Sequence, residues 1–424
     1  MRLPVIAAAV LLAACAASTA TAPHVGRVAY INGQIFDGER FAPGALIVES
    51  GRIVSTSASD ATSAAEHVDL QGGFVVPPFC EAHNHNLGDA DENQAVIDRY
   101  LSEGIFYVGT LSNLPALSHP VRHTYNTPNS VDTIFGNGGL TASGGHPIRL
   151  RETLLGYGLY PGFTRETLAD HSYFVIDNEA DLERKWTLIT SFRPDFIKIF
   201  LLWSEEYEAR RDDPDFFGQK GLDPALVPRI VERAHAEGLR VFAHVESAHD
   251  FHVAVASGVD VIAHLPGNDS PAQIDPGDAR LAAERGVAVM TTAVLIERPA
   301  RRRDAALYQA MREAQIANLR LLREAGVTFA VGSDEVRQTS SAEVSHLRGL
   351  GVFDNAALLR MWSRDCARTL FPERQLGELR SGYEASFLVL GADPLTDFDA
   401  TTDIRLRVKE GEVLQIAAQS AENP

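Results

Sequence analysis

A unit of helix, glycine and short apolar strand recurs through the middle of the chain, and this repetition most constrains the fold. Glycine directly after a helix takes the left-handed conformation that ends the helix. The strands are continuous apolar runs, as expected for parallel strands that are covered on both faces. The repetition therefore predicts an α/β fold, either a (β/α)₈ barrel or a doubly wound sheet. The helix-ending glycines are Gly104, Gly238, Gly258, Gly286 and Gly326, and the strands span 105–111, 239–244, 259–265, 287–292 and 327–332.

The two ends of the chain have a different pattern, with short strands separated by turns. The segments VESGRIV (48–54) and VKEGEVL (408–414) are typical of matching β-hairpins. We therefore expect residues 23–78 and 376–424 to form one small β-sandwich, with the barrel at 79–375 inserted between its halves.

The first residues indicate export. Arg2 precedes an uncharged apolar run, 5–14, which has the length of a signal-peptide core and is too short to span a bilayer. The following Leu12-Ala13-Ala14-Cys15 resembles a bacterial lipobox, in which cleavage before the cysteine leaves a lipid-bearing residue. Ordinary cleavage after Ala22 is the alternative, which Pro23 disfavours. We expect 1–22 to be a signal peptide, and the protein to be a periplasmic or outer-membrane lipoprotein of a bacterium.

Composition excludes several classes of protein. The 424-residue chain is 45% hydrophobic and 22% charged, as in globular proteins with a large core. Its net charge of −18 disfavours nucleic acid as a partner. Three cysteines do not make a disulfide scaffold. Export permits a bond between Cys80 and Cys366, but their contexts indicate a buried strand and a helix, so we predict free thiols.

Polar side chains that do not belong in a core stand at the ends of the predicted strands. His83 and His85 follow one apolar run, and side chains two residues apart on a strand point to the same face. His244, His264 and Asp334 end three further strands. In a barrel these strand ends surround a single cavity, where barrel active sites lie. Each motif alone has a plain alternative, a hydrogen-bonded polar residue at a strand end.

Lys198 is the remaining unusual residue, because Phe196, Ile197, Ile199 and Phe200 flank it. A lysine inside a buried strand is costly unless its charge is paired or removed. The plain alternative is a salt bridge.

The order His-x-His, Lys, His, His, Asp resembles the metal-dependent amidohydrolase superfamily, with prolidase-like and imidazolonepropionase-like members the closest match. The resemblance covers nearly the whole chain after the signal. It implies that His83, His85 and Asp334 bind one divalent ion. It also implies that CO₂ carbamylates Lys198, whose new carboxylate bridges two ions.

His244 and His264 would hold the second ion by the same resemblance, and zinc suits imidazole and carboxylate ligands. Two ions can share a hydroxide and polarise a carbonyl. Asp334 would accept the proton of that hydroxide and pass it to the leaving nitrogen. Three positions depart from the usual family pattern. Pro77-Pro78 stands where Pro-Gly is usual, Glu81 stands where an aspartate is usual before His-x-His, and Ser386 follows Ala385 in place of aspartate.

The substrate side is less constrained. His146 in TASGGHP resembles a position that contacts substrate in prolidase-like members. Tyr125, Arg149 and Arg151 are candidate anchors for a substrate carboxylate.

Together these features predict hydrolysis of amide or other non-ester C–N bonds, on dipeptides or N-acyl amino acids. Two alternatives stay open. One is a one-metal enzyme for cyclic amides or deamination, which a merely structural Lys198 would allow. The other is a non-catalytic binding lipoprotein. We expect a small-molecule partner and membrane contact only through the lipid anchor, and we leave the oligomeric state open.

Overall fold

The computed structural model describes residues 26–88, 93–336 and 338–415. The predicted signal peptide, its lipobox and Cys15 lie outside this range. Within it, no helix combines the length and apolar character required to cross a bilayer.

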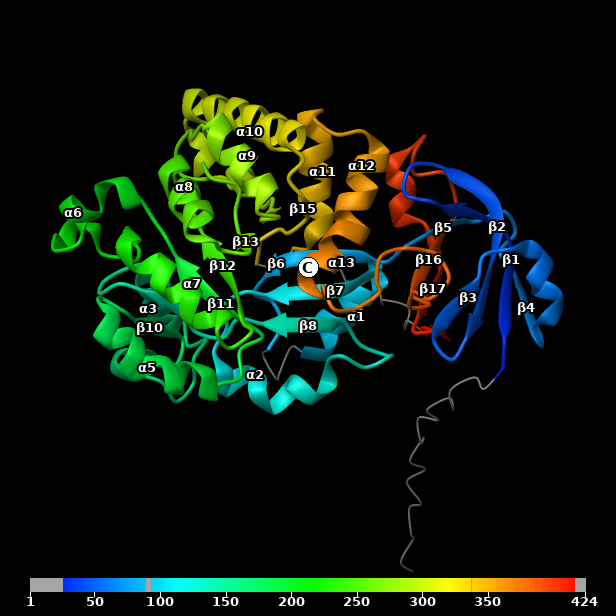
Figure 1. Cartoon of the computed structure of the whole chain (residues 1–424), viewed down its shortest axis with the longest axis horizontal. Coiled ribbons are helices and arrows are strands. Elements are labelled where there is room, and N and C mark those ends of the chain that lie inside the picture. Colours follow the sequence, from blue (N-terminus) through cyan, green and yellow to red (C-terminus); the bar gives the residue numbers. More distant parts are fainter. Residues whose placement is uncertain (1–25, 89–92, 337, 416–424) are drawn as a thin grey trace, which may run out of the picture.

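Parallel strands surrounded by helices form the larger part of the molecule (Figure 1). The first parallel sheet contains β6 (Phe79–Asn84), β7 (Ile105–Thr110) and β8 (Asp132–Phe135). The second has the order β10-β9-β11-β12-β13-β14-β15. Its strands are β9 (Gly139–Thr141), β10 (Tyr173–Val175), β11 (Phe196–Phe200), β12 (Arg240–His244), β13 (Val261–Ile262), β14 (Ala288–Met290) and β15 (Phe329–Ala330).

Hydrogen bonds join the two parallel sheets on both sides. The N–H of Ala82 on β6 donates to the carbonyl of Val331, just after β15, at 2.8 Å. On the other side, the N–H of Asp195 donates to the carbonyl of Phe135 on β8 at 2.9 Å. The strands therefore close on themselves, and the predicted barrel class is confirmed.

Helices follow the strands and cover the barrel. The longest described helix, α10, is capped by Asp304, whose carboxylate accepts hydrogen bonds from the N–H groups of Ala306 and Leu307. Gly326, with φ of +85°, follows its last residue and ends the helix. All five glycines predicted to end helices have positive φ. The described helices are α1 (Asn93–Ser102), α2 (Pro115–Val121), α3 (Ile148–Gly156), α4 (Arg165–Leu168), α5 (Glu179–Ser191), α6 (Tyr207–Arg210), α7 (Val227–His235), α8 (Ala248–Ser257), α9 (Pro276–Glu284), α10 (Ala305–Ala325), α11 (Ser340–Leu350), α12 (Asn355–Arg360) and α13 (Cys366–Leu370).

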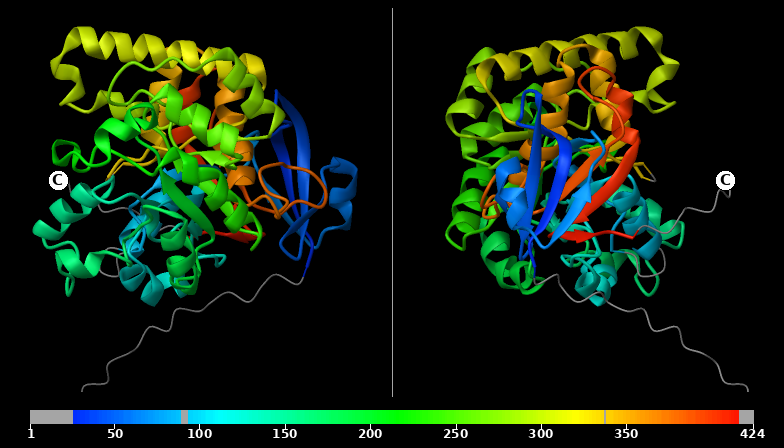
Figure 2. Two further views of the ribbon diagram at one scale, coloured as in Figure 1. Left: turned by 60° about the vertical axis from the view of Figure 1, so that its left-hand side comes forward. Right: turned by 90° about the vertical axis from the view of Figure 1, so that its right-hand side faces the viewer.

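The two chain ends meet in one mixed sheet, which lies beside the barrel (Figure 2). Strand β5 from the first half pairs antiparallel with β16 from the second, with Val75 opposite Val389. Both predicted hairpins are present, as the pairs β2–β3 and β17–β18. The domain boundaries proposed from sequence stay a prediction. The strands of this sheet are β1 (Val28–Phe36), β2 (Phe41–Glu49), β3 (Arg52–Ser55), β4 (Glu66–Asp69), β5 (Phe74–Val76), β16 (Phe387–Leu390), β17 (Ile404–Lys409) and β18 (Glu412–Val413).

A buried ion cluster ties the mixed sheet to the barrel. Lys409 of β17 has a fully buried side chain, and its Nζ lies 2.7 Å from Oδ1 of Asp132 on β8. Arg374 lies 2.7 Å from the other oxygen of Asp132 and also contacts Glu384. These cations neutralise carboxylates that would otherwise repel one another across the junction.

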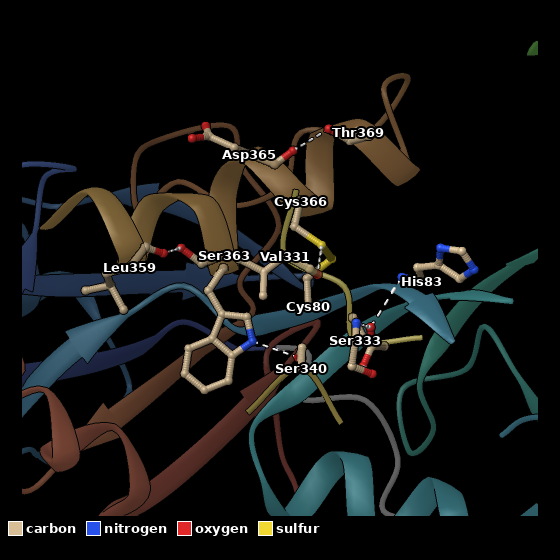
Figure 3. The surroundings of a disulfide bond; sticks show 12 residues. Cys80, His83, Val331, Ser333, Ser340, Leu359, Ser363, Asp365, Cys366 and Thr369 are labelled. Carbon is tan, nitrogen blue, oxygen red and sulfur yellow. Dashed lines mark hydrogen bonds between the residues drawn. A yellow bond between two sulfur atoms is a disulfide. The ribbon is translucent and has the colours of Figure 1, made fainter. Parts of the chain in front are cut away.

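The prediction of free cysteines is wrong. Cys80 on β6 and Cys366 at the start of α13 form a disulfide, with their Cα atoms 5.9 Å apart (Figure 3). The strand and the helix were correctly expected. Barrel closure packs α13 against β6, so two fully buried cysteines separated by 286 positions meet in the core.

Candidate metal centre

One cavity of about 770 Å³ is lined by all seven residues predicted as metal ligands or as the histidine that contacts substrate. These residues come from different barrel strands and from the segments that follow them, so chain-distant segments converge there. They are His83, His85, His146, Lys198, His244, His264 and Asp334.

Asp334 contacts the two histidines at the carboxyl end of β6, His83 within the strand and His85 directly after it. Its Oδ1 is 3.0 Å from Nε2 of His85 and 3.5 Å from Nε2 of His83. The other ring nitrogen of each histidine has a backbone acceptor. Nδ1 of His83 lies 2.8 Å from the carbonyl of Ala263, and Nδ1 of His85 lies 2.9 Å from that of Ser112. Such partners fix the ring orientation and leave Nε2 available as a ligand.

The backbone at Asp334 adopts the left-handed conformation, with φ of +48°. Its N–H donates to the carbonyl of His83 at 2.8 Å. Two residues earlier, a side chain at Gly332 would place its Cβ 2.6 Å from the His83 nitrogen. The glycine therefore permits the close approach between the segment after β15 and β6 that brings Asp334 to the histidines.

Glu81 also joins β6 to the segment after β15. It is fully buried and accepts hydrogen bonds from the N–H and the hydroxyl of Ser333, both at 2.8 Å. Burial raises the pKa of Glu81 to about 8. Asn84 also donates to the Ser333 hydroxyl at 3.0 Å. Ser333 and Asn84 are the chain neighbours of the proposed ligands Asp334 and His83, and their hydrogen bond joins the two segments. No sequence motif marks either residue.

The remaining histidines form a row of close rings. The centroid of His264 lies 4.5 Å from that of His83 and 4.3 Å from that of His244, and His146 stacks on His244 at 4.9 Å. Nδ1 of His264 lies 3.0 Å from the hydroxyl of Thr292, a partner that sequence reasoning missed. No local pattern marks Thr292, because the contact joins separate strands.

Burial keeps these rings neutral. It lowers the pKa of His83 to about 3 and that of His146 to about 4, and it holds those of His244 and His264 well below their ordinary value. Burial alone would raise the pKa of Asp334, but the nearby rings of His83 and His85 bring it well below its usual value. Neutral imidazoles beside an ionised carboxylate are the protonation states that a metal ion requires.

The side chain of Lys198 on β11 is 2% exposed, and its Nζ has no hydrogen-bond partner among the described residues. Burial lowers the pKa of this amine to about 7, which Asp334 partly opposes. The salt bridge considered from sequence is therefore not formed within the described range.

These observations fit a divalent metal site. Ligand atoms of His83, His264 and Asp334 lie within 4.8 Å of one another. His85 contacts the same carboxylate, and the buried Lys198 amine, which has no hydrogen-bond partner among the described residues, lines the same cavity. A second group of carboxylates, at Asp132, is already neutralised by Lys409 and Arg374.

Only one of the three candidate anchors for a substrate carboxylate lines the cavity. Arg151 on α3 is buried and lines the cavity. Arg149 is exposed and lies outside the cavity lining. Tyr125 is buried, where its hydroxyl donates to Asn93 and accepts from the N–H of Gly88.

One family model and several known proteins are similar to this chain. Residues 215–414 match the model of the amidohydrolase family. The chain is 23% identical over 372 residues to the imidazolonepropionase of Klebsiella pneumoniae subsp. pneumoniae, covering 82% of this chain and 86% of that protein. Among solved structures, the A. niger ochratoxinase is 19% identical with a TM-score of 0.72, covering 91% of this chain and 95% of its own. A prolidase complexed with N-methylphosphonate-L-proline is 20% identical with a TM-score of 0.71, covering 92% and 99%.

Proposed function

We propose that the chain is an amidohydrolase that cleaves C–N bonds and that it hydrolyses dipeptides or N-acyl amino acids, because residues 215–414 match the model of the amidohydrolase family. The observation that carries this proposal is the convergence of all seven predicted site residues on one cavity. The similar prolidase, with its proline-derived ligand, supports a small substrate of this class.

We assign His83, His85 and Asp334 to one divalent ion, and His244 and His264 to a second. When bound, the metal supplies Lewis-acid activation of water and of the scissile carbonyl. The donor set suits zinc. Within the protein, Ala263 and Ser112 orient the rings of His83 and His85 through their carbonyls.

Lys198 and Asp334 have the two remaining roles. At a pKa of about 7, a large fraction of Lys198 is the neutral amine, which can add CO₂ to form a carbamate. We propose that the carbamylated Lys198 would supply an anionic oxygen ligand to the metal centre. The Asp334 carboxylate accepts a proton from the attacking water and passes it to the leaving nitrogen.

Metal analysis tests this proposal directly. Protein lacking residues 1–22 is prepared with zinc and bicarbonate, and metal per chain is measured beside turnover of dipeptides and N-acyl amino acids. Two equivalents and turnover are expected. Lys198→Ala should bind less metal, and its metal content should no longer depend on bicarbonate. Lys185→Ala is the matched control, because Lys185 is partly buried and pairs with Asp170 outside the cavity. Protein that takes up no zinc would refute the hydrolase proposal.

A one-metal enzyme for cyclic amides or deamination is the second candidate. It is favoured by the compact group of His83, His264 and Asp334, which needs only one ion. One equivalent of zinc, unaffected by Lys198→Ala, would select this candidate.

We further propose that the protein is exported and anchored by a lipid on Cys15. The Cys80–Cys366 disulfide supports this proposal, since such bonds persist in oxidising compartments. Cys15→Ala should release the protein from membranes, and a membrane-bound variant would refute the lipid anchor.

A further inference from the structure

The cavity wall contains four arginines, and three of them already have carboxylate partners. Arg210 pairs with Glu206, Arg298 with Glu335, and Arg301 with Asp269. Arg151 is the fourth arginine, and it has no carboxylate partner among the described residues.

Arg151 contacts only neutral groups. Its Nη1 donates to the hydroxyl of Tyr160 at 2.7 Å, and its Nη2 donates to the hydroxyl and the carbonyl of Ser112 at 2.6 and 3.1 Å. Among the described residues, the buried Nε atom has no hydrogen-bond partner, and no Asp or Glu forms an ion pair with this side chain. Arg151 is 8% exposed.

A buried guanidinium without a counter-charge is costly, because burial removes most of its hydration and nothing ionic replaces it. The guanidinium also matches the planar geometry of a carboxylate better than any other side chain. Ser112 places it near the metal centre, because the carbonyl that accepts from Arg151 also accepts from His85.

We infer that Arg151 binds the carboxylate of the substrate and thereby selects acids over neutral amides. This inference rests on the proposed hydrolysis of C–N bonds at the same site. It narrows the substrate to an acyl or peptidyl amino acid with a free carboxylate close to the scissile bond.

Apolar side chains on the same cavity define the other end of the substrate. Leu150 and Leu154 lie on α3 beside Arg151, and Trp203 and Val336 stand on loops that follow other strands. Leu150 is 47% exposed and Val336 is 68% exposed, so this part of the wall has apolar surface available for contact. We therefore expect a substrate with a bulky apolar group in addition to the carboxylate.

The test compares N-acetyl-L-phenylalanine with its neutral carboxamide on the zinc-loaded protein. Affinity is measured by calorimetry, or as KM where the compound is hydrolysed, and release of acetate is followed separately. Wild-type protein should prefer the acid by about 10- to 100-fold, the range of a charge-assisted contact. Arg151→Gln should remove this preference and leave binding of the carboxamide within about twofold.

Arg149→Gln is the matched control, because this arginine stands two positions away on the same helix, outside the cavity. It should keep the preference of the wild type. If Arg151→Gln does not fold, the inference is tested with the wild type and Arg151→Lys. The lysine variant should retain part of the wild-type preference for the acid over the carboxamide.

A purely structural role for Arg151, acting through Ser112 and His85, makes a different prediction. Arg151→Gln would then weaken both compounds equally and lower the zinc content. That result, or a wild type without preference for the acid, would overturn the inference. If the acid binds in an Arg151-dependent manner but no acetate is released, the role of Arg151 stands and the proposed hydrolysis is rejected. If acetate is released but the acid is not preferred over the carboxamide, the proposed hydrolysis stands and the role of Arg151 is rejected.

Discussion

Removing the Cys80–Cys366 disulfide should destabilise the protein by an amount set mainly by the length of chain that it closes. The bond joins β6 to α13 across 286 positions, so it encloses nearly the whole barrel. We consider Cys80→Ala, Cys366→Ala and the double variant, in protein lacking residues 1–22 so that Cys15 does not interfere.

The magnitude follows from the entropy of loop closure. For a loop of 286 residues the chain-entropy relation gives about 5.7 kcal/mol. Measured disulfides usually contribute less, about 2–4 kcal/mol, so we expect a loss of about 3–5 kcal/mol in the free energy of unfolding. A chain of roughly 400 residues has an unfolding entropy of roughly 0.8 kcal/mol per kelvin, so the melting temperature should fall by about 4–6 °C.

The two single variants and the double variant separate the cross-link from local packing. Each single substitution already breaks the bond, so all three variants should lose nearly the same stability in guanidinium titrations. If the cysteines were only buried small residues, the single losses would be small and would add in the double variant. Additivity, or two free thiols in the denatured wild-type protein, would refute the disulfide.

Three further predictions concern the site and the core. Asp334→Asn should keep metal but lose most turnover, and an unchanged kcat would exclude Asp334 as the proton carrier. Burial raises the pKa of Glu343 from 4.5 to about 7, so its ionisation should reduce stability by about 3 kcal/mol as pH rises through that range, and chemical denaturation of Glu343→Gln should lack this decline. Lys409→Met should destabilise the protein by about 3–5 kcal/mol by leaving Asp132 without this cation, and Asp132→Asn in the same background should restore part of the loss in thermal unfolding.

The barrel, and the meeting of the candidate site residues at one cavity, were predictable from local patterns. An apolar run followed directly by a polar residue marks the end of a parallel strand, and this pattern holds for His244 and His264. His83 and Asp334 also lie close behind apolar runs, with one or two other residues between. The described strands are shorter than the apolar runs, as with β13 (Val261–Ile262) for the run 259–265. The runs predict burial, which extends past the last ladder hydrogen bond.

The contacts that orient the site were not predictable, because they join segments that have no relation in the sequence. Cys80 meets Cys366 only once the barrel has closed. The partners of the rings, Ser112 and Thr292, are ordinary loop residues until another strand lies beside them. The sequence shows that Arg151 is charged, but only the folded structure shows that the groups it contacts are neutral.

Glu81 shows how a departure from the family pattern can leave the site intact. Its carboxylate crosses from β6 to the segment after β15 and accepts both donors of Ser333, the residue before Asp334. The shorter side chain of aspartate would reach less far, so the glutamate and the serine form a matched pair. Because Ser333 also bonds to Asn84, the pair holds both flanks of His83. The departure therefore changes the support of the proposed ligands and leaves the ligands themselves in position.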